Sequence, residues 1–177
     1  LSGCSLSTAS GLENAKELIY LDMSDNAIRK LAPIGSLQKL QELNFAHNAL
    51  NDLTALASVK SLVSIDVSYN NLTTLSPITE ITGLKSVIAG NNNISELSNL
   101  DKLTAVEILD LSYNTLTDVA VLGNCVALKE LNISNNSVAD ISSFSALKLL
   151  SDLNFANNKV KTLPVFTADC QLVNIDG

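Results

Sequence analysis

Few side chains in this sequence have the types and spacing that catalysis or metal binding requires. His47 is the only histidine, and the three cysteines, Cys4, Cys125 and Cys170, lie far apart in the chain. A nucleophilic triad or a zinc site needs several such groups to converge, and no cysteine pair has the short spacing of a zinc site. We therefore expect no enzyme activity, no cofactor and no metal site, and we interpret His47 as a solvated turn residue.

Carboxylates are the remaining groups with chemical potential. The sequence holds 18 Asp and Glu against 11 Lys and Arg, which gives a net charge of −7. Nucleic acids and anionic membrane surfaces are disfavoured as partners, because both require basic patches. Stacked carboxylates could instead attract Ca²⁺ or a basic protein. A merely solvated polar face is our first interpretation, and binding of a cation to the row of Asp residues is left open.

The elements that must position these groups form a repeat of constant length. An asparagine recurs every 22 residues without insertion or deletion, at Asn26, Asn48, Asn70, Asn92, Asn114, Asn136 and Asn158. A fixed period of this kind marks a solenoid, in which each repeat packs only on its neighbours. Asparagine carries both a donor and an acceptor, so a stacked ladder of these side chains is expected to satisfy buried backbone groups. We predict a structural role for the ladder.

Apolar spacing predicts two different elements within each repeat. The step Leu21-x-Met23 has period two, which is typical of a short strand, and neighbouring repeats should pair these strands in parallel. We place the strand centres at Leu21–Met23, Leu43–Phe45, Ile65–Val67, Val87–Ala89, Leu109–Leu111, Leu131–Ile133 and Leu153–Phe155. The following apolar residues are spaced by three, which suits a 3₁₀ helix. Pro33 and Pro77 stand where this helix would begin, a position that tolerates a missing N–H.

The repeat resembles the leucine-rich repeat, whose pattern is L-x-x-L-x-L-x-x-N/C-x-L. Around Asn26 the chain reads Leu18-x-x-Leu21-x-Met23-x-x-Asn26-x-Ile28. The resemblance implies an α/β solenoid: a right-handed horseshoe with a parallel concave sheet and short 3₁₀ helices on the convex side. We expect one such domain over residues 1–177, with seven repeats and a partial repeat at each end, as a piece of a longer protein.

One subclass, the 22-residue repeats of bacterial internalins, is especially similar. The segment Asn70-Asn-Leu72-Thr-Thr-Leu75-Ser-Pro77-Ile78 follows its form, and Asp52, Asp118 and Asp140 occupy its Asp position. This resemblance implies a secreted or surface-attached bacterial protein that binds a protein of a host or neighbouring cell through its concave sheet. A related 22-residue class includes an intracellular phosphatase regulator. It suggests the alternative of a cytoplasmic scaffold or phosphatase regulator.

The cysteines fit the repeat better than they fit any bridge. Cys4 occupies the asparagine position of a partial first repeat, although Leu1-Ser-Gly-Cys4 also resembles a bacterial lipoprotein signal. Cys125 takes a position that is apolar in other repeats, which predicts a buried thiol. Cys125 and Cys170 are two repeats apart, about 10 Å at sheet spacing, whereas a disulfide needs Cα atoms within roughly 7 Å. We expect no internal disulfide and no direct membrane insertion, because no apolar run approaches the ~20 residues of a spanning helix.

Two rows of residues should point outward from the concave side, because side chains alternate faces along a strand. The first row comprises Asp22, Asn44, Asp66, Ile88, Asp110, Asn132 and Asn154. The second row, two residues earlier, comprises Tyr20, Glu42, Ser64, Ser86, Ile108, Glu130 and Asp152. A third row, two residues after the first, contains only Ser, Ala or Gly. These small residues either leave room for a partner or pack tightly in a curved sheet.

Departures from these rows predict where a protein partner binds. Ile88 and Ile108 interrupt polar rows on adjacent strands, and Tyr69 and Tyr113 lie at strand ends beside them. Exposed apolar patches often mark binding sites, and tyrosine is a common interface anchor. Ordinary drift between repeats is the competing explanation, since single exposed apolar residues are normal. The predicted partner-binding residues are Tyr20, Asp66, Tyr69, Ile88, Ile108, Asp110 and Tyr113.

Overall fold

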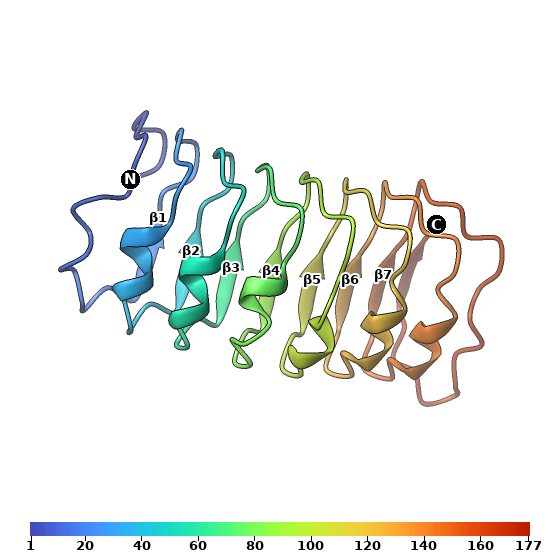
Figure 1. Ribbon diagram of the computed structural model, residues 1–177. Coiled ribbons are helices and arrows are strands. Elements are labelled where there is room, and N and C mark those ends of the chain that lie inside the picture. Colours follow the sequence, from blue (N-terminus) through green and yellow to red (C-terminus); the bar gives the residue numbers. More distant parts are fainter.

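The computed structural model describes residues 1–177 and shows a row of stacked coils with one strand in almost every coil (Figure 1). The strands pair in parallel, in chain order, to form one eight-stranded sheet. Their bounds are β1 Tyr20–Asp22, β2 Glu42–Asn44, β3 Ser64–Asp66, β4 Ser86–Ile88, β5 Ile108–Asp110, β6 Glu130–Asn132, β7 Asp152–Asn154 and β8 Asn174–Asp176. The predicted solenoid horseshoe with a parallel sheet is confirmed.

Strand register follows the repeat length. Leu21 lies opposite Leu43, and Leu43 lies opposite Ile65, so that each strand pairs with the strand 22 residues later. Each of the first seven strands is centred on the first residue of its predicted centre, as β1 is on Leu21 of Leu21–Met23. The hydrogen-bonded ladder continues past the assigned end of the strand to the second residue, since the amide of Met23 donates to the carbonyl of Asn44 at 2.9 Å. Terminal residues of such short strands are a matter of definition.

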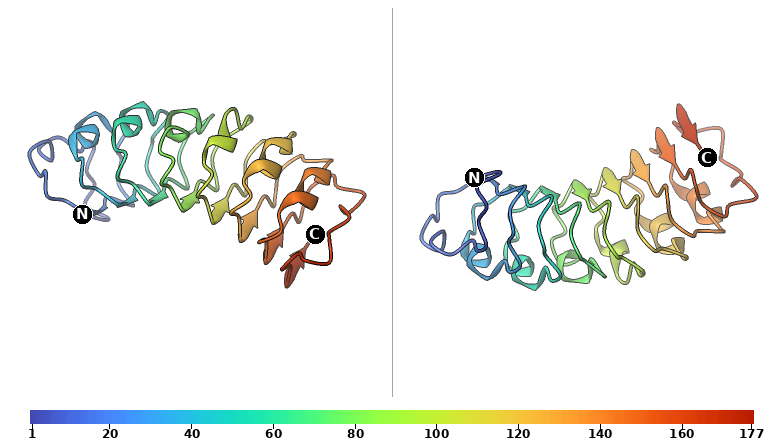
Figure 2. Two further views of the ribbon diagram at one scale, coloured as in Figure 1. Left: turned by 90° about the horizontal axis from the view of Figure 1, so that it is seen from below. Right: turned by 90° about the horizontal axis from the view of Figure 1, so that it is seen from above.

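Short 3₁₀ helices form the opposite side of the coils between β1 and β7, as Figure 2 shows along the edge facing away from the strands. Their bounds are η1 Ala32–Ser36, η2 Thr54–Ser58, η3 Ser76–Ile78, η4 Leu100–Lys102, η5 Ala120–Asn124 and η6 Ser142–Ala146. In the first of them, amides of Ile34 and Leu37 donate to carbonyls three residues earlier at 2.8 and 2.9 Å. This bonding pattern brings side chains three apart to one face, so the apolar residues all turn inward. None of these helices is both long and apolar enough to cross a membrane.

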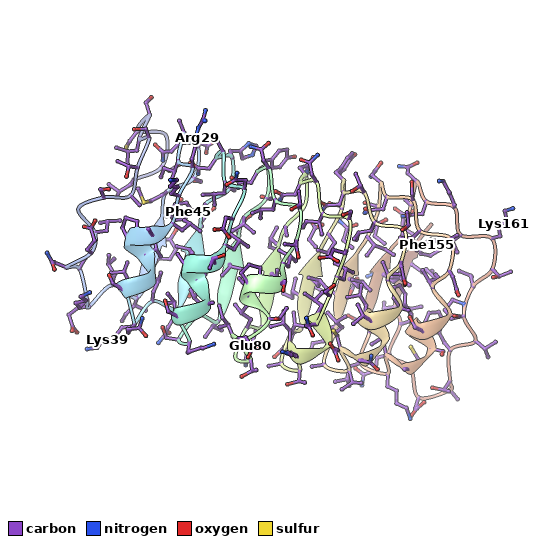
Figure 3. All side chains as sticks on the ribbon, viewed as in Figure 1. Arg29, Lys39, Phe45, Glu80, Phe155 and Lys161 are labelled. Atoms are coloured by element: carbon purple, nitrogen blue, oxygen red, sulfur yellow. The ribbon has the colours of Figure 1, made fainter.

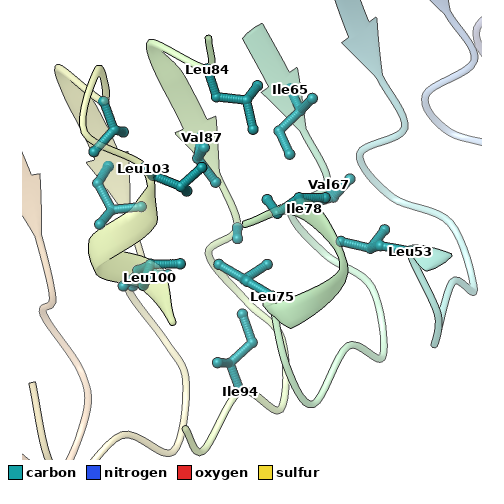
Figure 4. Packing of buried hydrophobic residues seen from close by; sticks show 14 of the residues in the cluster. Leu53, Ile65, Val67, Leu75, Ile78, Leu84, Val87, Ile94, Leu100 and Leu103 are labelled. Carbon is teal, nitrogen blue, oxygen red and sulfur yellow. The ribbon is translucent and has the colours of Figure 1, made fainter. Parts of the chain in front are cut away.

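The core is one continuous stack of aliphatic side chains between the sheet and the 3₁₀ helices (Figure 4). It comprises 45 buried residues, with Phe45 and Phe144 as the largest side chains that are fully buried. Each repeat repeats the same inward positions, so every layer packs against the layers on either side. Two apolar layers per repeat, one from the strand and one from the 3₁₀ segment, hold the sheet in place.

The repeated asparagines join each coil to the coil before it. Asn70 illustrates the pattern: its Oδ1 accepts the amide of Leu50 at 2.8 Å, and its Nδ2 donates to the carbonyls of Phe45, Val67 and Ser68 at 2.9, 3.0 and 3.0 Å. The same acceptor contact recurs at Asn26, Asn48, Asn92, Asn114, Asn136 and Asn158. The ladder thus satisfies polar groups at the turn that leaves each strand.

All three cysteines are free thiols. Cys125 is buried, in agreement with its place in the repeat, and this burial raises the pKa of its thiol to about 11. Cys4 is exposed and occupies the ladder position of the first coil, where its Sγ lies 3.4 Å from the carbonyl oxygen of Ser2. Cys170 is half-buried in the last coil.

Ion pairs between successive coils lie away from the outward face of the sheet, and Figure 3 labels Lys39 and Glu80 among their members. Lys39 pairs with Glu17 at 2.6 Å, and Lys102 pairs with Glu80 at 2.6 Å. The Glu107 carboxylate lies between two lysines, Lys129 at 2.5 Å and Lys85 at 3.6 Å. Because these side chains are largely exposed, each pair contributes little stability.

Candidate functional site

The outward face of the sheet is the candidate site, because the core covers only the other face of the sheet and the outward side chains line a hollow. In each of the first seven strands the central residue is buried and its two neighbours point outward. The two predicted outward rows are therefore the lining of this face.

The Asp and Asn row is more than a solvated surface, because it also closes the turn that follows each strand. The Oδ1 atom of Asp66 accepts the amide of Ser68 at 2.9 Å, and that of Asn44 accepts the amide of Ala46 at 3.0 Å. The same bond, to the amide two residues on, recurs at Asp22, Asp110, Asn132 and Asn154. Asp and Asn both offer this acceptor, which explains why they alternate in the row. Sequence reasoning missed this role, although the pattern of Asp or Asn two residues before Ser or Ala was visible.

Ile88 breaks this hydrogen-bond pattern. It stands in the same row but has no acceptor, so the amide of Gly90 lacks the side-chain partner that its counterparts have. A hydrogen bond of this kind contributes about 1 kcal/mol. The equivalent residues of the six other strands up to β7 all make this bond. Because isoleucine at position 88 gives it up, this substitution is harder to explain by drift between repeats than an ordinary surface substitution.

The row of small residues is closely packed. Ser24, Ala46, Ser68 and Ser112 are all buried. In the same row, a Cβ added to Gly90 would lie only 2.9 Å from Ser112 Oγ. Of the two explanations for this row, tight packing in the curved sheet is the one that the structure supports.

The residue before each ladder asparagine has a left-handed backbone. The φ angle is between 51° and 57° at Asp25, His47, Tyr69, Asn91, Tyr113, Asn135 and Asn157. Asp and Asn tolerate this conformation, whereas a bulky side chain there is uncommon. His47 and Tyr69 nevertheless stack with ring centroids 4.0 Å apart, and Tyr113 exposes 56% of its surface. Strained residues tend to cluster at binding sites, so these aromatic turns are candidates for partner contact.

Replacing Tyr113 with asparagine should therefore stabilise the fold. The turns one repeat to either side hold Asn91 and Asn135 in the same conformation, and Tyr113 has little buried surface to lose. Relief of the left-handed strain is expected to raise the free energy of unfolding by about 0.5–1 kcal/mol, measured by urea denaturation. A lower free energy of unfolding would show that the ring itself supports the turn.

The structure brings most of the predicted partner-binding residues to one region of the face. Ile88 pairs in register with Asp66 on one side and with Asp110 on the other, and Ile108 begins the same strand as Asp110. Both isoleucines are half-buried, which is less exposed than the sequence suggests. Tyr69 and Tyr113 occupy turns that flank the turn of Asn91. We call Asp66, Tyr69, Ile88, Ile108, Asp110 and Tyr113 the central patch.

Tyr20 lies outside the central patch. It begins β1, which is three strands away from β4 in the order of the sheet. Its side chain is exposed, like those of Tyr69 and Tyr113, but it has no contact with either isoleucine through strand pairing. It therefore lies on the same face as the patch but apart from it.

A hollow of about 730 Å³ extends from the central patch towards β8. Ile88 and Ile108 line one end of it, and Asp110, Glu130 and Asp152 follow on successive strands. Hydrogen bonds from the Ser151 hydroxyl and the Asn174 side-chain amide lower the pKa of Asp152 below its usual range. No three His, Cys, Asp or Glu side chains come together in a way that could hold a metal ion.

Comparison with family models finds one match, described as leucine-rich repeats (2 copies). It covers residues 16–58, 104–146 and 126–168, which together make up more than half of the chain. A comparison with curated protein sequences finds no significant match.

Two bacterial crystal structures have closely similar folds. Internalin C2 from Listeria monocytogenes is 25% identical, with a TM-score of 0.94, and the match covers 98% of this chain and 76% of that one. The internalin inlF of the same organism is 28% identical, with a TM-score of 0.87, over 97% of this chain and 51% of that one. The chain thus spans about half of the second protein's structure.

A more distant structure shares the fold alone. A leucine-rich-repeat protein of Leptospira interrogans is 22% identical, with a TM-score of 0.69, and the match covers 93% of this chain and 50% of that one. Sequence pattern, coil geometry and these matches all agree on the same architecture.

Proposed function

Because the chain belongs to the leucine-rich-repeat family and is internalin-like, we propose that it is a bacterial surface or secreted module that binds a protein partner through its concave sheet. Leucine-rich-repeat domains are protein–protein interaction modules and are typically not enzymes. The bacterial location is supported by the internalin structures, whose folds match nearly the whole chain. We propose no catalytic activity and no cofactor for this chain.

The main observation in support of this binding site is that Ile88 stands in a row of residues that otherwise accept hydrogen bonds. It gives up a bond made by the equivalent residue of every other strand from β1 to β7, and it lies beside Ile108 and between two strained tyrosine turns. Apolar and tyrosine side chains surrounded by carboxylates are typical of the centre and rim of an interface. We therefore assign partner contact to the central patch.

A photo-cross-linking experiment tests this assignment. Photoreactive phenylalanine analogues at Tyr113, beside the concave face, and at Val126, beyond η5 on the other side of the coil, would report two surfaces of equal exposure, since each native side chain is 56% exposed. After capture of surface proteins from host or neighbouring cells by the full-length protein, we expect cross-links from position 113 and few from position 126. Cross-links from position 126 alone would contradict binding through the concave face.

A further inference from the structure

The hollow beside the central patch combines apolar and anionic groups. The half-buried side chains of Ile88 and Ile108 form its apolar end, while Asp110, Glu130 and Asp152 extend across β5, β6 and β7. Neighbouring strands are about 4.8 Å apart, so these carboxylates lie within reach of one short extended segment. The unpaired amide of Gly90 lies at the strand exit beside Ile88, where its counterparts bond to outward-facing side chains.

The outward strand positions carry only negative charge. The outward positions of the eight strands hold seven carboxylates and no Lys, Arg or His; the seven are Asp22, Glu42, Asp66, Asp110, Glu130, Asp152 and Asp176. The other eleven of the 18 acidic residues are matched by the 11 Lys and Arg residues, all of which lie elsewhere. The seven carboxylates therefore equal the entire net charge of −7.

Neighbouring lysines offset only part of this field. Lys85 and Lys129 stand just before β4 and β6 and share the single carboxylate of Glu107, which precedes β5, so the three groups together carry one positive charge against the three carboxylates of the hollow. Inside the hollow, the side-chain amide of Asn132 donates to Asp110 at 3.4 Å, and that of Asn174 donates to Asp152. Both donors are uncharged, so these hydrogen bonds leave the negative charge of the two carboxylates in place. The concave face thus attracts cations, and it does so beside an apolar surface.

The arrangement of these carboxylates favours a protein cation over a metal ion. They follow one another along the sheet and do not converge, and no group of three meets the geometry of a metal site. A metal ion would also leave Ile88 and Ile108 unused. An extended peptide segment, in contrast, presents cationic and apolar side chains together with backbone carbonyls.

Given the protein-binding function proposed above, we propose that the partner presents a lysine- or arginine-rich segment with an aliphatic or aromatic residue, which packs on Ile88 and Ile108. Its cationic side chains lie against Asp110, Glu130 and Asp152, and one of its carbonyls accepts the free amide of Gly90. Opposite charges speed encounter and fix the register of the segment, while the apolar contact slows its release.

Binding of short fluorescent peptides to the chain, followed by anisotropy, tests this inference. We expect a lysine- and arginine-rich peptide with a central leucine to bind, and its glutamate-containing counterpart not to bind. Affinity should fall as salt is added, because salt screens the charges. The variant Asp110→Asn/Glu130→Gln/Asp152→Asn should bind the basic peptide about tenfold more weakly or worse. Asparagine is a safe choice at position 110, since Asn44, Asn132 and Asn154 hold the same turn.

A charge-matched control separates the hollow from the net charge. The variant Glu17→Gln/Glu80→Gln/Asp101→Asn removes as many carboxylates at exposed positions away from the concave face, and its affinity should stay close to that of the native chain. Equal weakening in both variants, or equal binding of the glutamate peptide, would overturn the inference. A captured protein partner could lose its binding to Ile88→Asp/Ile108→Asp while its affinity is unchanged by salt and by Asp110→Asn/Glu130→Gln/Asp152→Asn. That result would leave the proposed function intact and refute the cationic chemistry of the partner.

Discussion

Replacing Asn92 with alanine is expected to lower the free energy of unfolding by roughly 2–4 kcal/mol, because it leaves a buried backbone donor without a partner. Asn92 Oδ1 accepts the amide of Leu72 at 3.0 Å, and its Nδ2 donates to the carbonyls of Val67, Ala89 and Gly90 at 3.0, 3.1 and 3.2 Å. The three carbonyls keep other donors, namely Asn70, Asn114 and the amide of Tyr69. The amide of Leu72 has no substitute, so its loss dominates.

Aspartate at the same position should be worse than alanine at neutral pH. It keeps the acceptor for Leu72 but places a buried negative charge against three carbonyl oxygens, which is strongly unfavourable. The pKa of this carboxyl in the folded protein should therefore lie above its unfolded value of about 3.9. The folded state then binds more protons than the unfolded state, so stability decreases as pH rises through this range and is recovered on acidification.

Urea denaturation of both variants at neutral and acidic pH measures these effects. Asn93→Ala is the matched control, since Asn93 is the exposed neighbour of Asn92 and its side chain makes no hydrogen bond; it should change stability by less than about 0.5 kcal/mol. If Asn92→Ala were as mild as the control, the ladder would be a consequence of the fold and not a source of its stability. If Asn92→Asp lowered the free energy of unfolding less than Asn92→Ala at neutral pH, the position would not need the donor that the Asn92 side-chain amide supplies.

The double variant Ile88→Asp/Ile108→Asp is expected to reduce affinity for the partner protein at least about tenfold. Full burial of an exposed isoleucine side chain contributes about 1.5–3 kcal/mol, and each 1.4 kcal/mol is a factor of ten. Because both side chains are already half-buried, about half of that contribution is lost at each position. The fold should survive, because both side chains are only half-buried and the aspartate introduced at position 88 would supply the acceptor that the amide of Gly90 lacks.

Two measurements decide this prediction: affinity by titration calorimetry and melting temperature by circular dichroism. The control Asn44→Asp/Asn154→Asp adds the same charge to the same face without removing an apolar group, and Asp already closes the equivalent turns at Asp66 and Asp110. We expect its affinity to be equal or higher. Native-like affinity in the isoleucine variant would remove the central patch from the interface.

Most of this fold can be predicted from the sequence because the same pattern of apolar residues and asparagine occurs in seven successive repeats. Leu21, Leu43 and Ile65 can be placed in register from spacing alone, and the spacing of three after Ile28 indicates the 3₁₀ turns. Hydrogen bonding runs past Asp22 to Met23, so both residues of the predicted centre Leu21–Met23 belong to the ladder.

The site was harder to predict because its features depend on backbone conformation. Asn91 and Asn135 suggest the left-handed turns, because asparagine tolerates that conformation. Tyr69 and Tyr113 occupy the equivalent positions but give no such indication, because tyrosine does not favour it. The amide of Gly90 can be recognised as lacking a side-chain acceptor only by comparison with neighbouring strands, where Asp66 and Asp110 each accept the amide two residues on. Ile88 and Ile108 stood out in the sequence as departures, but their half-buried state depends on the curvature of the sheet.

Because the side chain of each ladder asparagine bonds only to its own coil and to the coil before it, the number of coils is independent of this local chemistry. The Asn70 side chain bonds to Leu50 and Phe45 in the preceding coil and to no residue of the following coil. Gain or loss of a whole 22-residue unit would preserve every such contact, whereas a single inserted residue would break two layers at once. Duplication of a 22-residue unit can therefore lengthen the concave surface, while substitutions within a unit change the side chains that line it.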